Sequence, residues 1–331
     1  MIIQELLTFF TSKYPNLVQD MKNSDHGNEF GLNPFHMEGD IFTHSVMVLK
    51  EAENAQDIHK YAAILHDIGK PYVRQVVDTK TRFFSHDPVS GFLALDIMKD
   101  LNLDQLTKEK LFKLICLHTD AFRLTKEQQA EKYHDYGLQK LVLEFGNYDS
   151  SGRICIDERV TDFDTNPLAY KPNIDPNKGK TVTILVGLPY SGKSTYTSSL
   201  MTSGEIFVVS RDQIIMNLVE GQNYNDAYKN VDQDMVNIEL QKEFKQAKLQ
   251  DNVVVDMTHM SAKSRRKSLA HFGKDWTKKC IVFLPPLTEI IRRSEIRLDK
   301  KISQDVIFDM IKRFSPPLEG EGFHNIEYRF E

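Results

Sequence analysis

The stretch Gly187-Leu-Pro-Tyr-Ser-Gly-Lys193-Ser194-Thr195 decides the fold of the C-terminal half of this chain. It follows the apolar run 181–186 and fits the pattern G-x-x-x-x-G-K-[ST] at every fixed position. The glycines allow a tight loop whose amides face phosphate oxygens, so the pattern predicts a phosphate-binding loop between a strand and a helix. The expected ligands of ATP, or of another nucleoside triphosphate, are Gly187, Ser191, Gly192, Lys193, Ser194 and Thr195. Lys193 is expected to contact the outer phosphates and to take part in catalysis, and Ser194 is expected to bind Mg²⁺. A glycine turn with a chance Lys-Ser is the alternative.

The sequence around this loop predicts an α/β domain with a parallel sheet. Short apolar runs at 182–186, 206–209, 253–255 and 280–284 alternate with helical segments. Residues 1–160 instead show helical patterns, such as 42–49 and 106–117, without a series of strands, and predict an all-α domain. Residues 161–180 are rich in turn formers and are the expected linker to the second domain, 181–331.

Composition limits the class of protein. The 331 residues carry a formal charge of -5, too balanced for a protein that coats nucleic acid through general positive charge. Three scattered cysteines form no disulfide framework. Without a basic leader, or an apolar run near the roughly 20 residues that span a bilayer, we expect a soluble cytoplasmic protein.

A second chemical signature lies in the N-terminal half. The sequence His66-Asp67-Ile68-Gly69-Lys70 follows a helical pattern, and further His and Asp residues before and after it complete an ordered set. The expected metal ligands are His44, His66, Asp67, His86, His118 and Asp149. Mixed nitrogen and oxygen ligands suit Mn²⁺, Fe²⁺, Co²⁺ or Ni²⁺. His86 and His118 are the candidates for binding a second ion, and Asp67 would bridge the two ions, which lie about 4 Å apart in such sites. Lys70 is expected to pair with a phosphate.

Each member of this set has an ordinary alternative. His118 could be a core or surface histidine, and His86 a turn residue. A competing pair, His134-Asp135, lies in a polar stretch and is expected to be a solvated turn. His36, Glu38 and Asp40 either line the pocket or serve as caps and loop residues, the second being our expectation.

On these residues, the segment from about 30 to 155 resembles the HD-domain metal-dependent phosphohydrolases. The approach Phe35-His36-Met37-Glu38-Gly39-Asp40 also looks like the HD segment of tRNA nucleotidyltransferases. The resemblance implies a helical fold in which His44, His66, Asp67 and Asp149 bind metal.

Two carboxylates follow strands of the C-terminal half. Asp212 comes after the strand at 206–209, and Asp256 ends the strand at 253–255. Ligands bind at the carboxyl edge of such a sheet. We expect Asp212 to accept the proton of an acceptor hydroxyl that attacks the γ-phosphate, and Asp256 to act on Mg²⁺ or its waters. Helix capping by Asp212 and a turn role for Asp256 are the alternatives.

Arg293 and Arg297 are four residues apart, which predicts one shared helix face. We expect both to close over the ATP phosphates, although a basic run also forms solvated helix faces. The order of these features resembles the polynucleotide 5′-hydroxyl kinases over about 180–326, with a similar closing segment at 311–323. The sequence departs from that family at Ile215, where an arginine is usual, and at His259, where an asparagine is usual.

A phosphohydrolase joined to such a kinase resembles the bacterial HD-Pnk end-healing proteins. That resemblance implies an enzyme that clears a 2′,3′-cyclic or terminal phosphate and adds a 5′-phosphate to RNA or DNA ends, with a separate ligase acting afterwards. We also expect no membrane association, and a homo-oligomer is possible. Two alternatives remain: a nucleoside or nucleotide kinase fused to a nucleotidase, and a kinase with a non-catalytic nucleic-acid-binding platform.

Overall fold

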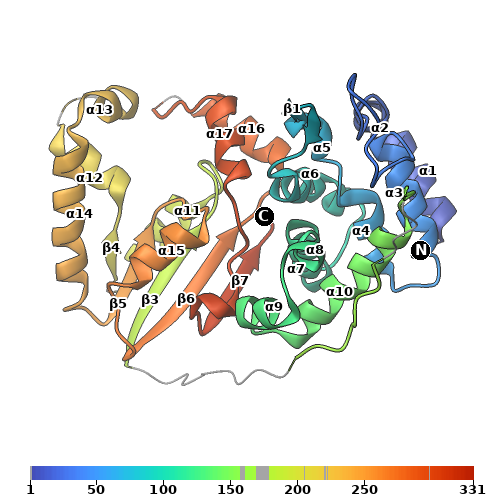
Figure 1. Ribbon diagram of the computed structural model, residues 1–331. Helices are drawn as coiled ribbons and strands as arrows, with labels where there is room; N and C mark the ends of the chain where they lie inside the picture. Colours follow the sequence, from blue (N-terminus) through green and yellow to red (C-terminus); the bar gives the residue numbers. More distant parts are fainter. Residues whose placement is uncertain are drawn as a thin grey trace. The chain divides into compact units, whose positions relative to one another are not determined.

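The computed structural model describes residues 2–156, 161–168 and 179–331, except 205, 220, 222 and 298. The chain divides into two compact units, Met1–Tyr170 and Lys171–Glu331. Each is described by itself (Figure 1). Of the expected linker, residues 169–178 lie outside the described residues, whereas Phe163 and Leu168 hydrogen-bond to Asn147 and Gln139 of the helical unit.

The first unit is helical, as predicted. Its described helices are α1 (Ile3–Lys13), α2 (Pro15–Lys22), α3 (Ile41–Glu51), α4 (Asp57–Leu65), α5 (Lys70–Val73), α6 (His86–Asp100), α7 (Gln105–Leu117), α8 (Asp120–Arg123), α9 (Lys126–Tyr133) and α10 (Tyr136–Ser151). Side-chain caps begin several of them: Asp104 accepts from Thr107 N before α7, and Asp135 accepts from Leu138 N before α10. The sequence did not predict the short hairpin of β1 (Gln75–Val77) and β2 (Lys80–Arg82), whose six residues bury almost no apolar surface.

A tight contact between α6 and α7 supports the helical core. Phe92 and Phe112 meet edge to face, with ring centroids 5.8 Å apart. A Cβ atom added to Gly91 would lie 2.5 Å from Cys116 Sγ, so only glycine allows α6 to approach α7 this closely. The next turns of the same two helices carry candidate site residues, so this packing fixes their positions.

The second unit contains the predicted parallel sheet. Its strands are β3 (Lys180–Val186), β4 (Phe207–Val209), β5 (Asn252–Asp256), β6 (Trp276–Phe283) and β7 (Asn325–Arg329), in the order β4-β5-β3-β6-β7 with every pairing parallel. Its helices are α11 (Lys193–Ser203), α12 (Arg211–Leu218), α13 (Tyr224–Asn230), α14 (Gln233–Ala247), α15 (Ala262–Leu269), α16 (Leu287–Ile296) and α17 (Gln304–Lys312), with a 3-10 turn η1 at Glu319–Glu321. The carboxyl ends of β3, β4 and β5 meet at one edge, which brings the phosphate-loop segment beside Asp212 and Asp256.

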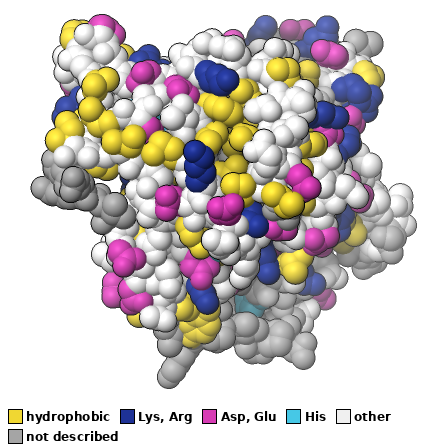
Figure 2. All heavy atoms as spheres, turned by 90° about the vertical axis from the view of Figure 1, so that its right-hand side faces the viewer, with side chains coloured by type: hydrophobic (Ala, Val, Ile, Leu, Met, Phe, Trp, Pro, Cys, Tyr) yellow, Lys and Arg dark blue, Asp and Glu magenta, His cyan; other side chains and the backbone are white. Residues whose placement is uncertain are grey.

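Surface charge is mixed. On the face shown in Figure 2, Lys and Arg side chains are scattered among acidic and hydrophobic ones, and no continuous basic surface is visible. Among the described residues no helix is long and apolar enough to span a membrane.

Candidate active sites

Six side chains that the sequence singled out meet at one buried centre of the helical unit. They come from five separate places: α3, the residues directly after α4, the start of α6, the residue after α7, and α10. Each is at most 5% exposed: His44, His66, Asp67, His86, His118 and Asp149. The structure therefore brings together residues more than 100 positions apart in the sequence, such as His44 and Asp149, whose Nε2 and Oδ1 atoms are 3.1 Å apart.

Asp67 lies between two pairs of histidines. Its Oδ2 is 3.1 Å from His66 Nε2 and 3.8 Å from His44 Nε2. Its Oδ1 is 3.3 Å from His86 Nε2 and 3.7 Å from His118 Nε2. One carboxylate oxygen thus faces each pair, the arrangement that a bridging ligand between two ions requires.

Backbone hydrogen bonds fix the orientation of three of these rings. Nδ1 of His66, His86 and His118 each donates to the carbonyl oxygen three residues earlier, at 3.0, 2.8 and 2.8 Å. Because Nδ1 of each ring is used by the backbone, Nε2 is the nitrogen that points to the centre and is left to bind a metal. Histidines that bind a metal through one ring nitrogen commonly donate a hydrogen bond from the other, as these three do.

His44 is oriented by a carboxylate instead. Its Nδ1 lies 2.9 Å from Glu38 Oε1, whose other oxygen accepts from Ile154 N at 3.0 Å. Burial disfavours the charged ring, but Asp149 and Glu38 outweigh it and raise the pKa of His44. Glu38 therefore does not behave as the loop residue that we expected. Asp40 does cap α3, through Thr43 N, as the cap interpretation predicted.

Among the described residues, His66 Nε2 and Asp67 Oδ1 have no hydrogen-bond partner, while Asp67 Oδ2 pairs with the Lys70 ammonium group. Unpaired buried polar atoms are costly, and a bound cation would satisfy both of these atoms. Desolvation opposes ionisation of Asp67 and Asp149, yet neighbouring positive charges, from His66 and Lys70 at Asp67 and from Arg153 at Asp149, hold both pKa values well below the usual range. The donor set therefore fits one or two transition-metal ions.

The glycine of the His66–Lys70 segment has a structural cause. A Cβ atom on Gly69 would lie 2.5 Å from Ser90 N and 2.7 Å from His86 O, and Gly69 N donates to Ser90 Oγ at 2.9 Å. The start of α6 thus rests directly on the backbone beside Asp67, which sets the distance between Asp67 and His86.

Two charged residues of this centre were not predicted from the sequence. Arg153 donates to Asp149 through Nη2 at 2.8 Å, and Asp87 Oδ1 lies 3.2 Å from His86 Nε2. The available signals were the spacing of four residues between Asp149 and Arg153, and the adjacent His86 and Asp87 in the sequence. By contrast, His134 and Asp135 form no part of the centre: His134 is the C-cap of α9, and Asp135 caps α10.

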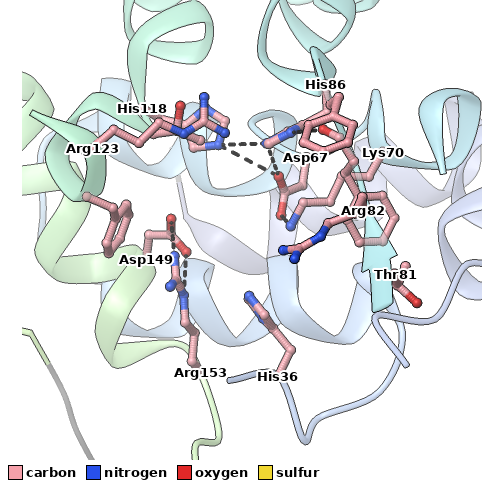
Figure 3. A pocket seen from close by; sticks show the side chains of 14 residues that line it. His36, Asp67, Lys70, Thr81, Arg82, His86, His118, Arg123, Asp149 and Arg153 are labelled. Carbon is pink, nitrogen blue, oxygen red and sulfur yellow. Dashed lines mark hydrogen bonds and ion pairs between the residues drawn. The ribbon is translucent and has the colours of Figure 1, made fainter. Parts of the chain in front are cut away.

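A pocket of about 290 Å³ opens onto the centre (Figure 3). Lys70 Nζ lies in it, 2.6 Å from Asp67 Oδ2 and 3.1 Å from His26 Nε2. The pocket lining combines ligand candidates with basic and aromatic side chains: His36, Asp67, Lys70, Thr81, Arg82, Phe83, Phe84, His86, His118, Thr119, Phe122, Arg123, Asp149 and Arg153. An anion with a flat apolar part would match this lining.

In the second unit, the predicted loop joins β3 to α11. Gly187 and Gly192 have φ values of 155° and 101°, which favour glycine. Lys193 is buried, and its Nζ donates to the carbonyl oxygens of Gly187 and Leu188 at 2.8 and 2.7 Å. Burial lowers the pKa of Lys193 to about 8, and Asp256 opposes this shift. Ser191, within the loop, is buried, while Ser194 and Thr195 are exposed at the start of α11.

Asp212 lies in the first turn of α12 but does not cap it. Ser210 is the N-cap and accepts from Gln213 N, so the capping alternative for Asp212 is wrong. Asp212 accepts from Tyr224 OH at 2.8 Å and from Lys300 Nζ at 2.5 Å. Desolvation disfavours its charge, but Lys300 and Tyr224 together hold the pKa of Asp212 below its usual value. Lys193 is close enough to add to this effect.

Asp256 and His259 have different surroundings. Asp256, at the end of β5, accepts from Thr197 Oγ1 at 3.2 Å, and desolvation raises its pKa. His259 is buried, donates from Nδ1 to Leu185 O at 2.9 Å, and lies 2.9 Å from Ser268 Oγ through Nε2. His259, which stands where the kinase pattern has an asparagine, therefore links β3 to α15. Ile215 is likewise fully buried, packed with Ala227 and Val236.

The two arginines do not share a helix face. α16 ends at Ile296, and Arg297 follows in an extended conformation, where it pairs with Asp299 at 2.9 and 3.0 Å. The predicted shared face is therefore wrong. Arg293 does reach the loop, donating to Tyr190 O at 3.3 Å.

Two protein-family models match this chain. Residues 41–144 match the HD domain model, and residues 182–317 match the AAA domain model. The chain joins an HD domain to an AAA-type P-loop domain. Both are enzyme domains. A P-loop kinase domain binds a nucleoside triphosphate with Mg²⁺, and an HD domain binds metal, for which His44, His66 and Asp149, or His66, Asp67 and His118, lie suitably close together.

The comparison with solved structures found partial matches. A chain of the Pnkp1/Rnl/Hen1 RNA repair complex is 20% identical over 42% of this chain and 45% of that chain, with a TM-score of 0.35. A fungal RNA kinase is 15% identical over 46% of this chain and 75% of its own, with a TM-score of 0.32. A gluconokinase from Sinorhizobium meliloti 1021 is 12% identical over 46% and 83%, with a TM-score of 0.33. The present chain thus spans less than half the length of the repair-complex chain. No curated protein matches it.

Proposed function

We propose that this protein is a bifunctional nucleic-acid end-healing enzyme. The P-loop domain transfers the γ-phosphate of ATP to a 5′-hydroxyl end, and the HD domain hydrolyses a 2′,3′-cyclic or terminal 2′- or 3′-phosphate. RNA is the expected substrate and DNA a second one. The observation that carries the proposal is the position of Asp67 between two histidine pairs at the base of a pocket rich in cations.

In the HD domain, protein side chains position the phosphoester. Lys70 Nζ and the Arg153 guanidinium are held by Asp67 and Asp149 and donate to non-bridging phosphate oxygens. His44, His66, Asp67, His86, His118 and Asp149 would hold the metal. When bound, the metal supplies a water of lowered pKa and neutralises charge on the phosphate. Glu38 keeps the His44 ring in place by accepting a hydrogen bond from His44 Nδ1.

In the P-loop domain, Lys193 leaves the Gly187 and Leu188 carbonyl oxygens and donates to the outer phosphates of ATP. Asp212 orients the 5′-hydroxyl. The hydroxyl oxygen attacks the γ-phosphorus, the bond from that phosphorus to the β–γ bridging oxygen breaks, and ADP leaves. The hydroxyl proton passes to the Asp212 carboxylate. Arg293, beside the loop, donates to the transferred phosphoryl group.

Hydrolysis of the cyclic phosphate to a 2′-phosphate, or removal of a terminal 3′-phosphate, frees the 3′-hydroxyl. A separate ligase joins this end to the new 5′-phosphate. We expect the enzyme to act in the cytoplasm. The two activities belong to one pathway of strand repair because each removes a different obstacle to the same joining reaction.

The decisive experiment offers two oligonucleotides to the intact protein. One carries a 5′-hydroxyl and is incubated with γ-labelled ATP and Mg²⁺; the other ends in a 2′,3′-cyclic phosphate and is incubated with Mn²⁺ or Ni²⁺. Label transfer and loss of the cyclic phosphate are expected. Phosphorylation of free nucleosides with no reaction on oligonucleotides would favour the small-molecule kinase and nucleotidase instead. Kinase activity with an inert, metal-free HD domain would favour a binding platform.

A further inference from the structure

Arg82 differs from the other cations that line the HD pocket. Lys70 lies 2.6 Å from Asp67, Arg153 lies 2.8 Å from Asp149, and Arg123 lies 3.5 Å from Asp87. The Arg82 side chain has no ion-pair or hydrogen-bond partner among the residues that the structure describes, and its guanidinium points into the pocket beside Lys70 (Figure 3). A guanidinium held there is available to an anion from outside.

The backbone on both sides of Arg82 is anchored. Thr81 Oγ1 donates to Gly27 O at 2.9 Å and accepts from Asn28 Nδ2 at 3.0 Å. The carbonyl oxygen of Phe83 accepts from His86 Nδ1 at 2.8 Å. Arg82 therefore sits in a hairpin strand that is tied directly to a candidate metal ligand, which limits the positions that its side chain can reach.

Two aromatic side chains are exposed at the same pocket. Phe84 is 57% exposed, and Phe122 is 37% exposed. Aromatic rings on a basic groove provide stacking surfaces for nucleobases. The pocket thus offers a buried centre for one phosphate, an unpaired guanidinium for another, and apolar surfaces for a base.

We propose that Arg82 binds the internucleotide phosphate next to the terminal nucleotide, and so makes the HD domain prefer strand ends to free nucleotides. The inference rests on the proposed function. Lys70 and Arg153 belong to the buried centre and meet the phosphate that is hydrolysed, because each contacts a candidate metal ligand. Arg82, without such a contact, takes the second phosphate, while the terminal base packs on Phe84.

The test compares Arg82→Gln with wild type on two substrates: a mononucleoside 2′,3′-cyclic phosphate, which has no second phosphate, and a dinucleotide that ends in a 2′,3′-cyclic phosphate. Loss of a charge-assisted hydrogen bond should raise KM for the dinucleotide about ten-fold, with kcat and the mononucleotide constants within two-fold of wild type. Lys80→Gln is the matched control, since Lys80 lies on the same strand but does not line the pocket.

A second readout does not require catalysis. Calorimetry with the chelator-treated protein measures binding of a dinucleotide that carries a 3′-phosphate, and Arg82→Gln should weaken it about ten-fold while Lys80→Gln does not. Equal effects on both substrates, or unchanged dinucleotide binding, would overturn the role of Arg82. If the wild-type protein hydrolyses neither substrate, the proposed phosphoesterase function is wrong, and the binding ratio still decides whether Arg82 recognises the second phosphate.

Discussion

The Asp212 carboxylate accepts from the Lys300 ammonium group at 2.5 Å, across 88 residues of sequence. Lys300 also lies 3.9 Å from the centroid of the Tyr224 ring, and Tyr224 donates to the other oxygen of Asp212. Both partners keep the carboxylate ionised and oriented. No local sequence pattern connects these residues, so only the fold brings them to the phosphate loop.

If Asp212 accepts the hydroxyl proton, Asp212→Asn should lower kinase turnover by about 10²-fold or more, because the amide keeps the size and shape of the side chain but does not take up the proton. ATP affinity should be unchanged or tighter. Since Ser210 caps α12, thermal stability should stay near wild type. Steady-state kinetics and calorimetry on this variant check both points; near-normal turnover would remove Asp212 from the catalytic residues.

Lys300→Met should move the acidic limb of the kinase pH profile to higher pH. Lys300 lowers the pKa of Asp212, so without it the carboxylate protonates at a higher pH, and turnover falls sooner as the solution is acidified. Lys301→Met is the control, because the described contact of Lys301 with Asn225 is made by the backbone N–H. Identical profiles for wild type and Lys300→Met would show that Lys300 does not act on the base.

ATP affinity should depend on the charge of Lys193. Burial places its pKa at about 8 in the free protein, and bound phosphates favour the protonated form. Affinity is therefore complete below pH 8 and should decrease as the pH rises above it. Titration calorimetry from pH 7 to 9.5 measures this slope, and Lys193→Ala should bind ATP weakly and without this pH dependence.

Lys193→Ala should also lose phosphate transfer and retain HD activity, as should Ser194→Ala. Parallel loss of both activities in a folded protein would contradict separate sites.

Asp67→Ala should remove phosphoesterase activity and bound transition metal together, because the side chain faces both histidine pairs. His66→Ala should do the same. His134→Asn tests the competing pair and should change neither property, since asparagine tolerates the left-handed conformation of that cap. Elemental analysis beside turnover provides the measurement, and wild-type turnover of Asp67→Ala with Mn²⁺ or Ni²⁺ would make the metal assignment wrong.

Glu38→Gln should reduce metal affinity about 10- to 100-fold, the usual effect of losing a partner behind a ligating histidine. The physical reason is the 2.9 Å contact that orients His44. Asp40→Asn is a matched control in the same segment, because asparagine caps a helix about as well as aspartate. Competition with a metal-binding dye measures both; equal affinities would assign Glu38 a purely structural role.

The sequence predicted those parts of the molecule that follow from local patterns. The phosphate loop, the helical unit and four of the five strands have such patterns, whereas β7 is short and mostly polar at a sheet edge. Contacts without a local sequence pattern were not predictable: Lys300 meets Asp212 across 88 residues, and Glu38 meets His44 because the loop before α3 turns back onto the helix. The prediction that Arg293 and Arg297 share a helix face was wrong because the helix ends between them. Ile215 departs from the kinase pattern because its side chain fills the core.

Tyr190 gives the phosphate loop a mechanical connection. Its hydroxyl group donates to Lys300 O at 2.7 Å and accepts from Ile302 N at 3.0 Å, so the loop and the backbone of Lys300 form one linked structure. A triphosphate that rearranges the loop should therefore also shift the lysine that is paired with Asp212. Binding of the nucleotide should then change the affinity of the site for the hydroxyl acceptor.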